Sequence, residues 1–114
     1  MGKDLGKTST GIQPNVAALL SYVAGFVTGI IFFLIEKDNK FVRFHALQST
    51  IAFGAIFVLQ MFFSYIPSIG VYLLPVLDLG CVILWVVCMV KAYQGEWFRL
   101  PVVGDVAAKQ AGLL

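Results

Sequence analysis

Three long runs of uncharged residues constrain this chain more than any other feature. Residues 16–35 and 46–65 each hold twenty residues without a charged side chain, and residues 71–90 hold twenty with one, Asp78. Twenty helical residues rise about 30 Å, which matches the hydrocarbon core of a bilayer. A soluble helical bundle is the alternative, but its helices need polar faces that these runs lack. The pattern predicts an all-α integral membrane protein with three transmembrane helices and short amphipathic interfacial segments.

The segments between the runs complete a single membrane domain over residues 1–114. Only 12% of the residues are charged, about half the usual share in a soluble domain, so a separate soluble domain is not expected. The predicted connecting segments are a polar N-terminal tail at 1–14, a charged and amphipathic loop at 36–45, a tight turn at 66–70 and an interfacial C-terminal tail at 91–114.

The basic residues predict an orientation. Three spans would put the two termini on opposite sides of the membrane. Six Lys and Arg residues would then share a side in the 36–45 loop and the C-terminal tail, against two in the N-terminal tail. Because basic loops stay in the cytoplasm, we expect a multi-pass protein of the cell membrane with the N-terminus outside and the C-terminus cytoplasmic.

Asp78 is the charged residue inside a predicted span. Gln60, Ser21 and Tyr22 fall at a similar depth in their own spans, so the four side chains form a candidate intramembrane polar layer. Such a layer can hold a proton or a cation, can hydrogen-bond one helix to another, or can lie near the headgroups in reach of water. All three interpretations remain open from the residues.

Small residues recur at every fourth position along the first predicted helix. This spacing lets two helix backbones approach closely. The predicted packing residues are Ala17, Ser21, Gly25 and Gly29, together with Gly54 from a similar stripe in the second run. The stripe either packs the first helix on the second inside one chain, or serves self-association or docking to a partner.

The chain has no pattern typical of an enzyme. Its single histidine, His45, excludes the two-histidine zinc motif, and neither a phosphate loop nor a nucleophile elbow occurs. Glu36 and Asp38 lack the spacing of a catalytic pair. Cys81 and Cys88 lie about 10 Å apart along one helix, too far for a disulfide. We therefore predict no catalysis, metal, cofactor or nucleic acid, and as partners the lipid bilayer and either another protein or further copies of this chain.

Two polar strings flank the second and third runs and carry most of the charge. They either anchor the helices at the membrane surface or form a docking surface for a partner. His45 is expected to be structural, with pH sensing as the alternative. The interfacial motif residues are Glu36, Lys37, Lys40, Arg43, Phe44 and His45 in the first string, and Gly95, Glu96 and Pro101 in the second.

Three strings of the chain resemble a known family. Residues 14–22, 36–49 and 91–96, the last followed by Leu100-Pro101, are similar to an uncharacterised prokaryotic family of small membrane proteins. That family is grouped with the Tic-twenty-like component of the chloroplast inner-envelope protein-import translocon. The resemblance covers residues 12 to 106 and implies a non-enzymatic translocon-type subunit, acting as a scaffold or in assembly or protein translocation. The alternative, from Asp78, is a small oligomeric channel or carrier for protons or cations.

Overall fold

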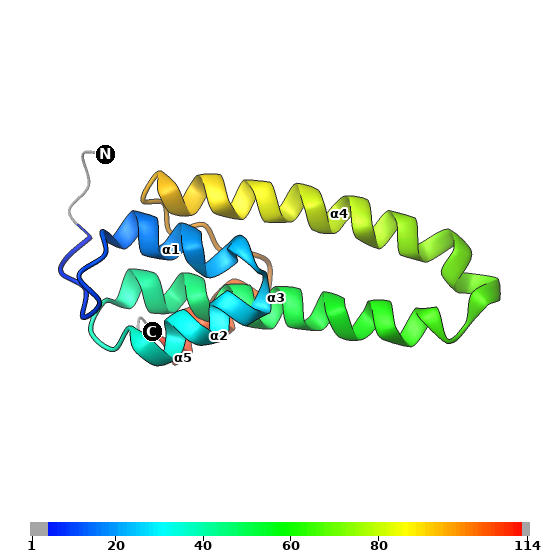
Figure 1. The fold of residues 1–114 in the computed structure, drawn as a ribbon, viewed down its shortest axis with the longest axis horizontal. Coiled ribbons are helices and arrows are strands. Elements are labelled where there is room, and N and C mark those ends of the chain that lie inside the picture. Colours follow the sequence, from blue (N-terminus) through cyan, green and yellow to red (C-terminus); the bar gives the residue numbers. More distant parts are fainter. Residues whose placement is uncertain (1–4, 113–114) are drawn as a thin grey trace.

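Two long antiparallel helices form the axis of the molecule, and three short helices surround one end of them (Figure 1). The structure is a computed structural model that describes residues 5–112, and its extents are 49 × 23 × 23 Å. The helices are α1 (Pro14–Val23), α2 (Phe26–Ile35), α3 (Lys40–Ser64), α4 (Pro67–Tyr93) and α5 (Val103–Gln110).

The molecule divides into a packed end and a bare end. We call residues 5–39 and 94–112 the collar, because they surround the beginning of α3 and the end of α4 (Figure 1). We call residues 54–84 the distal hairpin. In the distal hairpin every residue except Gly70 is at least partly exposed, so almost all burial occurs at the collar end.

The expected span 16–35 is not one helix. The chain breaks at Ala24 and Gly25, and α2 runs back alongside α1 (Figure 1). The two outer ends of this hairpin meet, since the backbone nitrogen of Ser9 lies 2.9 Å from a carboxylate oxygen of Glu36. A ten-residue helix rises only about 15 Å, half the hydrocarbon thickness. Of the three expected spans, α3 and α4 are long and apolar enough to cross a membrane, and the third is not shown.

Side chains satisfy the backbone groups that the break exposes, which an apolar environment requires. Gly25 adopts a φ of +61°, a left-handed conformation that favours glycine. Its carbonyl accepts from the Ser49 hydroxyl at 2.9 Å, and the Tyr22 carbonyl accepts from the Trp85 indole at 2.6 Å. The Thr28 hydroxyl accepts from the Ala24 N–H at 3.0 Å.

The two helices that are long and apolar enough to span begin earlier than the uncharged runs do. Asn39 caps α3 by accepting from the Val42 N–H at 3.0 Å, so the amphipathic residues 41–45 form the first turns of α3. Pro67 occupies the first turn of α4, where its missing N–H and fixed φ are favourable. The expected turn 66–70 therefore shortens to Tyr65 and Ile66.

The small residues pack α2 on α3 inside the chain. A Cβ at Gly29 would lie 2.7 Å from Oγ1 of Thr50 and 2.8 Å from the Ala46 carbonyl oxygen, and one at Gly25 would touch Phe53. Gly54 faces Phe26. Ala17 and Ser21 are buried on α1, on the other side of the break, so the stripe is divided between two antiparallel helices.

Replacing Gly29 by alanine is expected to destabilise the fold by about 1–3 kcal/mol, because the new methyl group presses on the α3 backbone. Gly80 is the matched control, since nothing lies within 4 Å of a Cβ built there, and alanine is the better helix former by up to about 1 kcal/mol. Denaturation in detergent micelles measures both. Equal stability of the two variants would contradict the close approach of α2 and α3.

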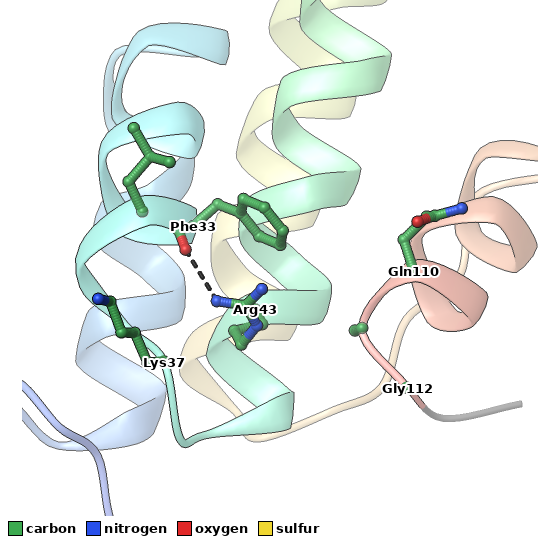
Figure 2. A pocket seen from close by; sticks show the side chains of 7 residues that line it. Phe33, Lys37, Arg43, Gln110 and Gly112 are labelled. Carbon is green, nitrogen blue, oxygen red and sulfur yellow. Dashed lines mark hydrogen bonds between the residues drawn. The ribbon is translucent and has the colours of Figure 1, made fainter.

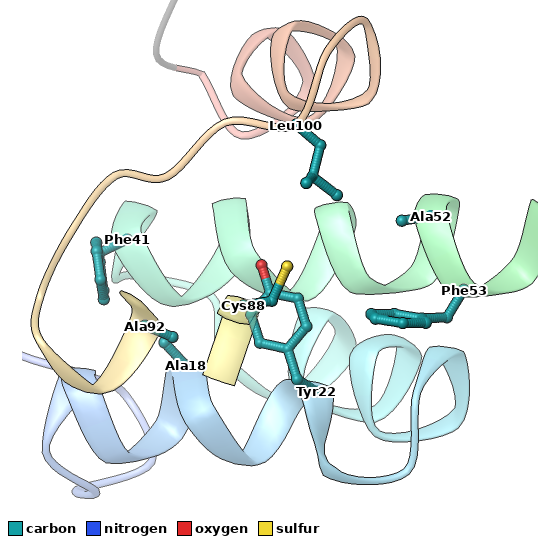
Figure 3. Packing of buried hydrophobic residues seen from close by; sticks show 8 residues of the cluster. All are labelled: Ala18, Tyr22, Phe41, Ala52, Phe53, Cys88, Ala92 and Leu100. Carbon is teal, nitrogen blue, oxygen red and sulfur yellow. The ribbon is translucent and has the colours of Figure 1, made fainter. Parts of the chain in front are cut away.

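The core lies where α1, α3 and α4 meet the segment that follows α4 (Figure 3). It contains Ala18, Tyr22, Phe41, Ala52, Phe53, Cys88, Ala92 and Leu100. Leu100 of the tail belongs to this core, so residues 94–102 pack against the bundle, although Gln94, Trp97, Arg99, Pro101 and Val102 stay exposed. The amphipathic helix α5 then returns along α3 and buries Ala107, Ala108 and Ala111 against Phe44.

Candidate functional site

A buried polar network connects α1, α3 and the segment after α4. The Tyr22 hydroxyl lies 2.7 Å from Nδ1 of His45, and Nε2 of Gln48 donates to the same hydroxyl at 2.9 Å. Nε2 of His45 lies 2.9 Å from the Glu96 carbonyl oxygen. All three side chains are fully buried. Chain positions 22, 45, 48 and 96 thus meet in one place.

The partners determine which His45 nitrogen carries the proton. A carbonyl oxygen accepts only, so Nε2 of His45 must donate to Glu96. Nδ1 is then the acceptor for the Tyr22 hydroxyl, and that hydroxyl accepts from Gln48. The imidazole is neutral in this arrangement, and both its nitrogens are occupied. The network holds the fold together and offers no free nitrogen to a substrate or metal.

Gln48 secures the segment that follows α4. Its Nε2 donates to the Phe98 carbonyl at 2.8 Å, and its Oε1 accepts from the Leu100 N–H at 2.9 Å. Asn15 of α1 donates to the Tyr93 carbonyl at 3.2 Å. Among residues 5–112, every buried side-chain nitrogen and oxygen has a hydrogen-bond partner, so the packing of the tail on the core leaves no buried side chain unpaired.

The carboxylate of Glu36 organises the polar face of the collar. It accepts from the Ser9 N–H and hydroxyl and from the N–H groups of Asp38 and Asn39, at 2.9–3.0 Å. Burial by itself raises the pKa of this carboxyl group. The backbone and hydroxyl donors outweigh burial and lower the pKa from 4.5 to about 2. Glu36 is therefore an ionised structural acceptor at neutral pH.

Arg43 fixes the end of α2. Its Nη1 donates to the Phe33 carbonyl at 2.9 Å and to the Glu36 carbonyl at 2.7 Å. Its guanidinium also stacks 4.0 Å from the centre of the Phe33 ring. The last carbonyls of a helix lack partners inside the helix, and a cation stabilises them. Arg43 thus holds the return leg of the broken hairpin against α3.

The candidate polar layer separates into two places. Gln60 donates to Asp78 on the distal hairpin, where the pair is exposed. Tyr22 belongs to the buried network in the collar, and the Ser21 hydroxyl bonds to the Ala18 carbonyl of its own helix. The break at Gly25 accounts for this, because α1 turns back before reaching the depth of the Asp78 pair.

The remaining motif residues contribute to the collar. Lys40 reaches the Gly112 carbonyl at 3.3 Å, and Phe44 is buried against α5. Gly95 has a φ of +78° in the turn after α4. Lys37 and Pro101 are exposed. Among residues 5–112, no three His, Cys, Asp or Glu side chains gather closely enough to hold a metal ion.

Sequence reasoning did not select Gln48, Asn39 or Trp85 as site residues. Each of the three bonds to a backbone group far along the chain, such as the bond from Asn39 to the Leu5 carbonyl at 2.8 Å. Asn39 lies in the predicted loop at 36–45, and Gln48 and Trp85 lie inside uncharged runs. Neither position identifies the distant backbone partner.

These features define a helical membrane protein with two long apolar helices and a polar-cored collar around one end of them. The chain belongs to the magnetosome magnetite crystal formation protein family, whose family model matches residues 10–107.

The curated relatives include UPF0132 membrane proteins and magnetosome proteins. A UPF0132 membrane protein of Archaeoglobus fulgidus is 54% identical over 89% of this chain and 98% of its own length. Another UPF0132 membrane protein, from Methanocaldococcus jannaschii, is 50% identical over 90% of this chain and 93% of its own. The magnetosome protein MamF of Paramagnetospirillum magneticum is 32% identical over 89% and 88%. No solved structure matches this chain.

The expected relationship to the Tic-twenty-like translocon component was wrong. The matching family and relatives are magnetosome and UPF0132 membrane proteins, and none of them supports protein translocation. The strings at 36–49 and 91–96 that carried the resemblance hold the collar against α3 and α4, through the Glu36 acceptor, the Arg43 bonds at the end of α2 and the His45 network. These strings therefore have a structural role in the fold and do not indicate protein translocation.

Proposed function

We propose that this chain is a non-enzymatic membrane scaffold that assembles with other transmembrane helices through its distal hairpin. The observation that carries the proposal is the exposed Gln60–Asp78 pair on an otherwise apolar surface. The buried polar side chains at the collar end are paired within residues 5–112, whereas the Gln60–Asp78 pair stays exposed.

The Gln60–Asp78 pair has unused hydrogen-bonding capacity. One amide N–H of Gln60 bonds to one oxygen of Asp78. The second amide N–H, the amide oxygen and the second carboxyl oxygen form no hydrogen bond to another residue among 5–112. Exposed apolar side chains such as Phe57 and Leu79 belong to the same hairpin. Lipid tails offer no hydrogen bonds, so covering the pair with another helix is favourable.

The family description supports a structural role. It names magnetite crystal formation, and two of the relatives are named as magnetosome proteins. Mineral formation at a membrane requires components to be organised there. A compact protein that fixes its depth with a collar and offers a hairpin for assembly suits such a role.

The charge distribution supports an orientation with the collar in the cytoplasm. Seven described Lys and Arg residues, from Lys7 to Lys109, all lie outside residues 44–90 and hence at the collar end. The positive-inside bias places that end in the cytoplasm. In this proposal the segment before α1 is cytoplasmic too, in contrast to the expected outside location, because α2 returns the chain to the side from which α1 started.

Replacing Asp78 by leucine is expected to weaken assembly about tenfold, the effect of losing a membrane hydrogen bond worth about 1–2 kcal/mol. The measurement is the mass and composition of the complex after extraction of native membranes into a lipid-preserving polymer. Tyr72→Phe is the control, since it removes an exposed hydroxyl from the same hairpin. Unchanged assembly in Asp78→Leu would refute the proposed role of the pair.

Asp78 also favours a second candidate, the small oligomeric channel or carrier for protons or cations. In an oligomer the Asp78 side chains of several copies can line a shared path. Asp78→Asn separates the two functions, because it retains hydrogen bonding and so preserves assembly while removing the charge. If the chain is a channel, the unmodified protein conducts protons or cations in liposomes and Asp78→Asn loses that flux. If it is a scaffold, neither protein produces a flux.

A further inference from the structure

A groove opens at the collar end where the loop after α2 faces the end of α5. It has a volume of about 500 Å³ and is lined by Phe33, Leu34, Lys37, Arg43, Gln110, Ala111 and Gly112. Figure 2 shows Lys37 on the α2–α3 loop and Gln110 on α5, with Arg43 of α3 between them. Helices α2, α3 and α5 and the loop between α2 and α3 therefore build the walls.

The polar side of the groove is cationic. Lys37 and Arg43 both line it, and none of its seven lining residues is acidic. Arg43 is held in place by its bonds to the Phe33 and Glu36 carbonyls. The carboxylate of neighbouring Glu36 is engaged with Ser9, Asp38 and Asn39. A fixed guanidinium beside an exposed ammonium is a typical arrangement for a phosphate.

The other side of the groove is apolar and continues along α2. Leu34 is 63% exposed, and the preceding turns of α2 expose Ile31, Ile30 and Val27. These side chains lead from the groove toward the tip of the α1–α2 hairpin. A ligand that satisfies both sides has an anionic head and a long apolar tail.

We propose that this groove binds an anionic phospholipid. The headgroup phosphate lies against Lys37 and Arg43, with the Gln110 amide as an additional donor, and an acyl chain follows the exposed face of α2. The position agrees with this occupant, because the groove lies at the end of α2 where apolar residues give way to the charged loop. The inference concerns the collar and does not depend on assembly through the distal hairpin.

The experiment is native mass spectrometry of the full chain in neutral detergent, titrated with dioleoylphosphatidylglycerol or dioleoylphosphatidylcholine. We expect one phosphatidylglycerol molecule to be retained about fivefold more tightly than phosphatidylcholine. Lys37→Gln should abolish that preference, since a basic residue near an anionic lipid contributes about fivefold in affinity. Lys7→Gln is the control for net charge, because Lys7 is exposed at the collar end but does not line the groove.

Arg43→Gln is less informative, because it also removes the hydrogen bonds to the carbonyls at the end of α2. A loss of lipid binding in that variant could come either from a lost lipid contact or from a disturbed fold. Lys37 has an exposed side chain and decides the question. Inorganic phosphate at millimolar concentration should leave the lipid bound if the acyl chain contributes. Equal retention of the two lipids, equal loss in Lys37→Gln and Lys7→Gln, or displacement by inorganic phosphate would each overturn the proposal.

Discussion

Replacing Gln48 by leucine is expected to release the segment after α4 from the core and to lower the free energy of unfolding by about 3 kcal/mol or more. The substitution keeps an apolar side chain of similar size but removes three hydrogen bonds, to Tyr22, Phe98 and Leu100. The Phe98 carbonyl and the Leu100 N–H then lose their hydrogen bonds to Gln48, and each unpaired buried group costs about 1–3 kcal/mol.

Two measurements check this prediction. Denaturation in detergent micelles gives the change in stability, and hydrogen exchange of residues 97–112 reports release of the tail. Gln94→Leu provides the control, because Gln94 is exposed at the end of α4. If the two variants have the same stability and exchange, the Gln48 network does not hold the tail.

The second large effect is expected at Glu36, through the pH dependence of stability. Its pKa is lowered from 4.5 to about 2 in the folded chain, so the unfolded chain binds a proton more readily. The stabilisation is fully present above pH 4.5 and is lost as the pH falls to about 2. A shift of this size corresponds to about 3 kcal/mol.

Glu36→Gln should therefore be less stable than the unmodified chain by about 3 kcal/mol at pH 7. The glutamine side chain lacks the negative charge, and its NH₂ group would face the N–H and hydroxyl donors that the carboxylate accepts from. The difference should shrink toward pH 2. Asp38→Asn removes the same charge from the exposed neighbour and should change stability little. A difference between Glu36→Gln and the unmodified chain that did not vary from pH 7 to pH 2 would exclude the carboxylate as its origin.

The sequence predicts the helical membrane class and the two long helices, because their uncharged runs are as long as a bilayer is thick. It does not predict the break in the first run. Gly25 reads as a small packing residue in a helix, since glycine is common in membrane helices. What stabilises the break are Ser49, Trp85 and Thr28, and two of these residues come from distant parts of the chain.

The site shows the same limit. Asp78 and Gln60 were assigned to one layer from depth alone, and they do bond to each other. Depth does not place Tyr22 correctly, because the chain turns back after α1 and Tyr22 lies in the buried network at the collar end. His45 and Gln48 both lie in the string at 36–49, yet their partners lie about fifty residues further along the chain. Sequence spacing gives depth along a helix but not the return path of the chain.

The broken α1–α2 hairpin has a consequence for how the chain enters a bilayer. In the proposed orientation, with α3 and α4 as the spans, the described segments on both sides of them stay on the cytoplasmic side, and the turn at Tyr65 and Ile66 is the connection that crosses. That turn carries no charge, so insertion moves no ionised loop across the hydrocarbon. The α3–α4 pair can enter as one folded unit, and the collar can then close around it from the side of synthesis.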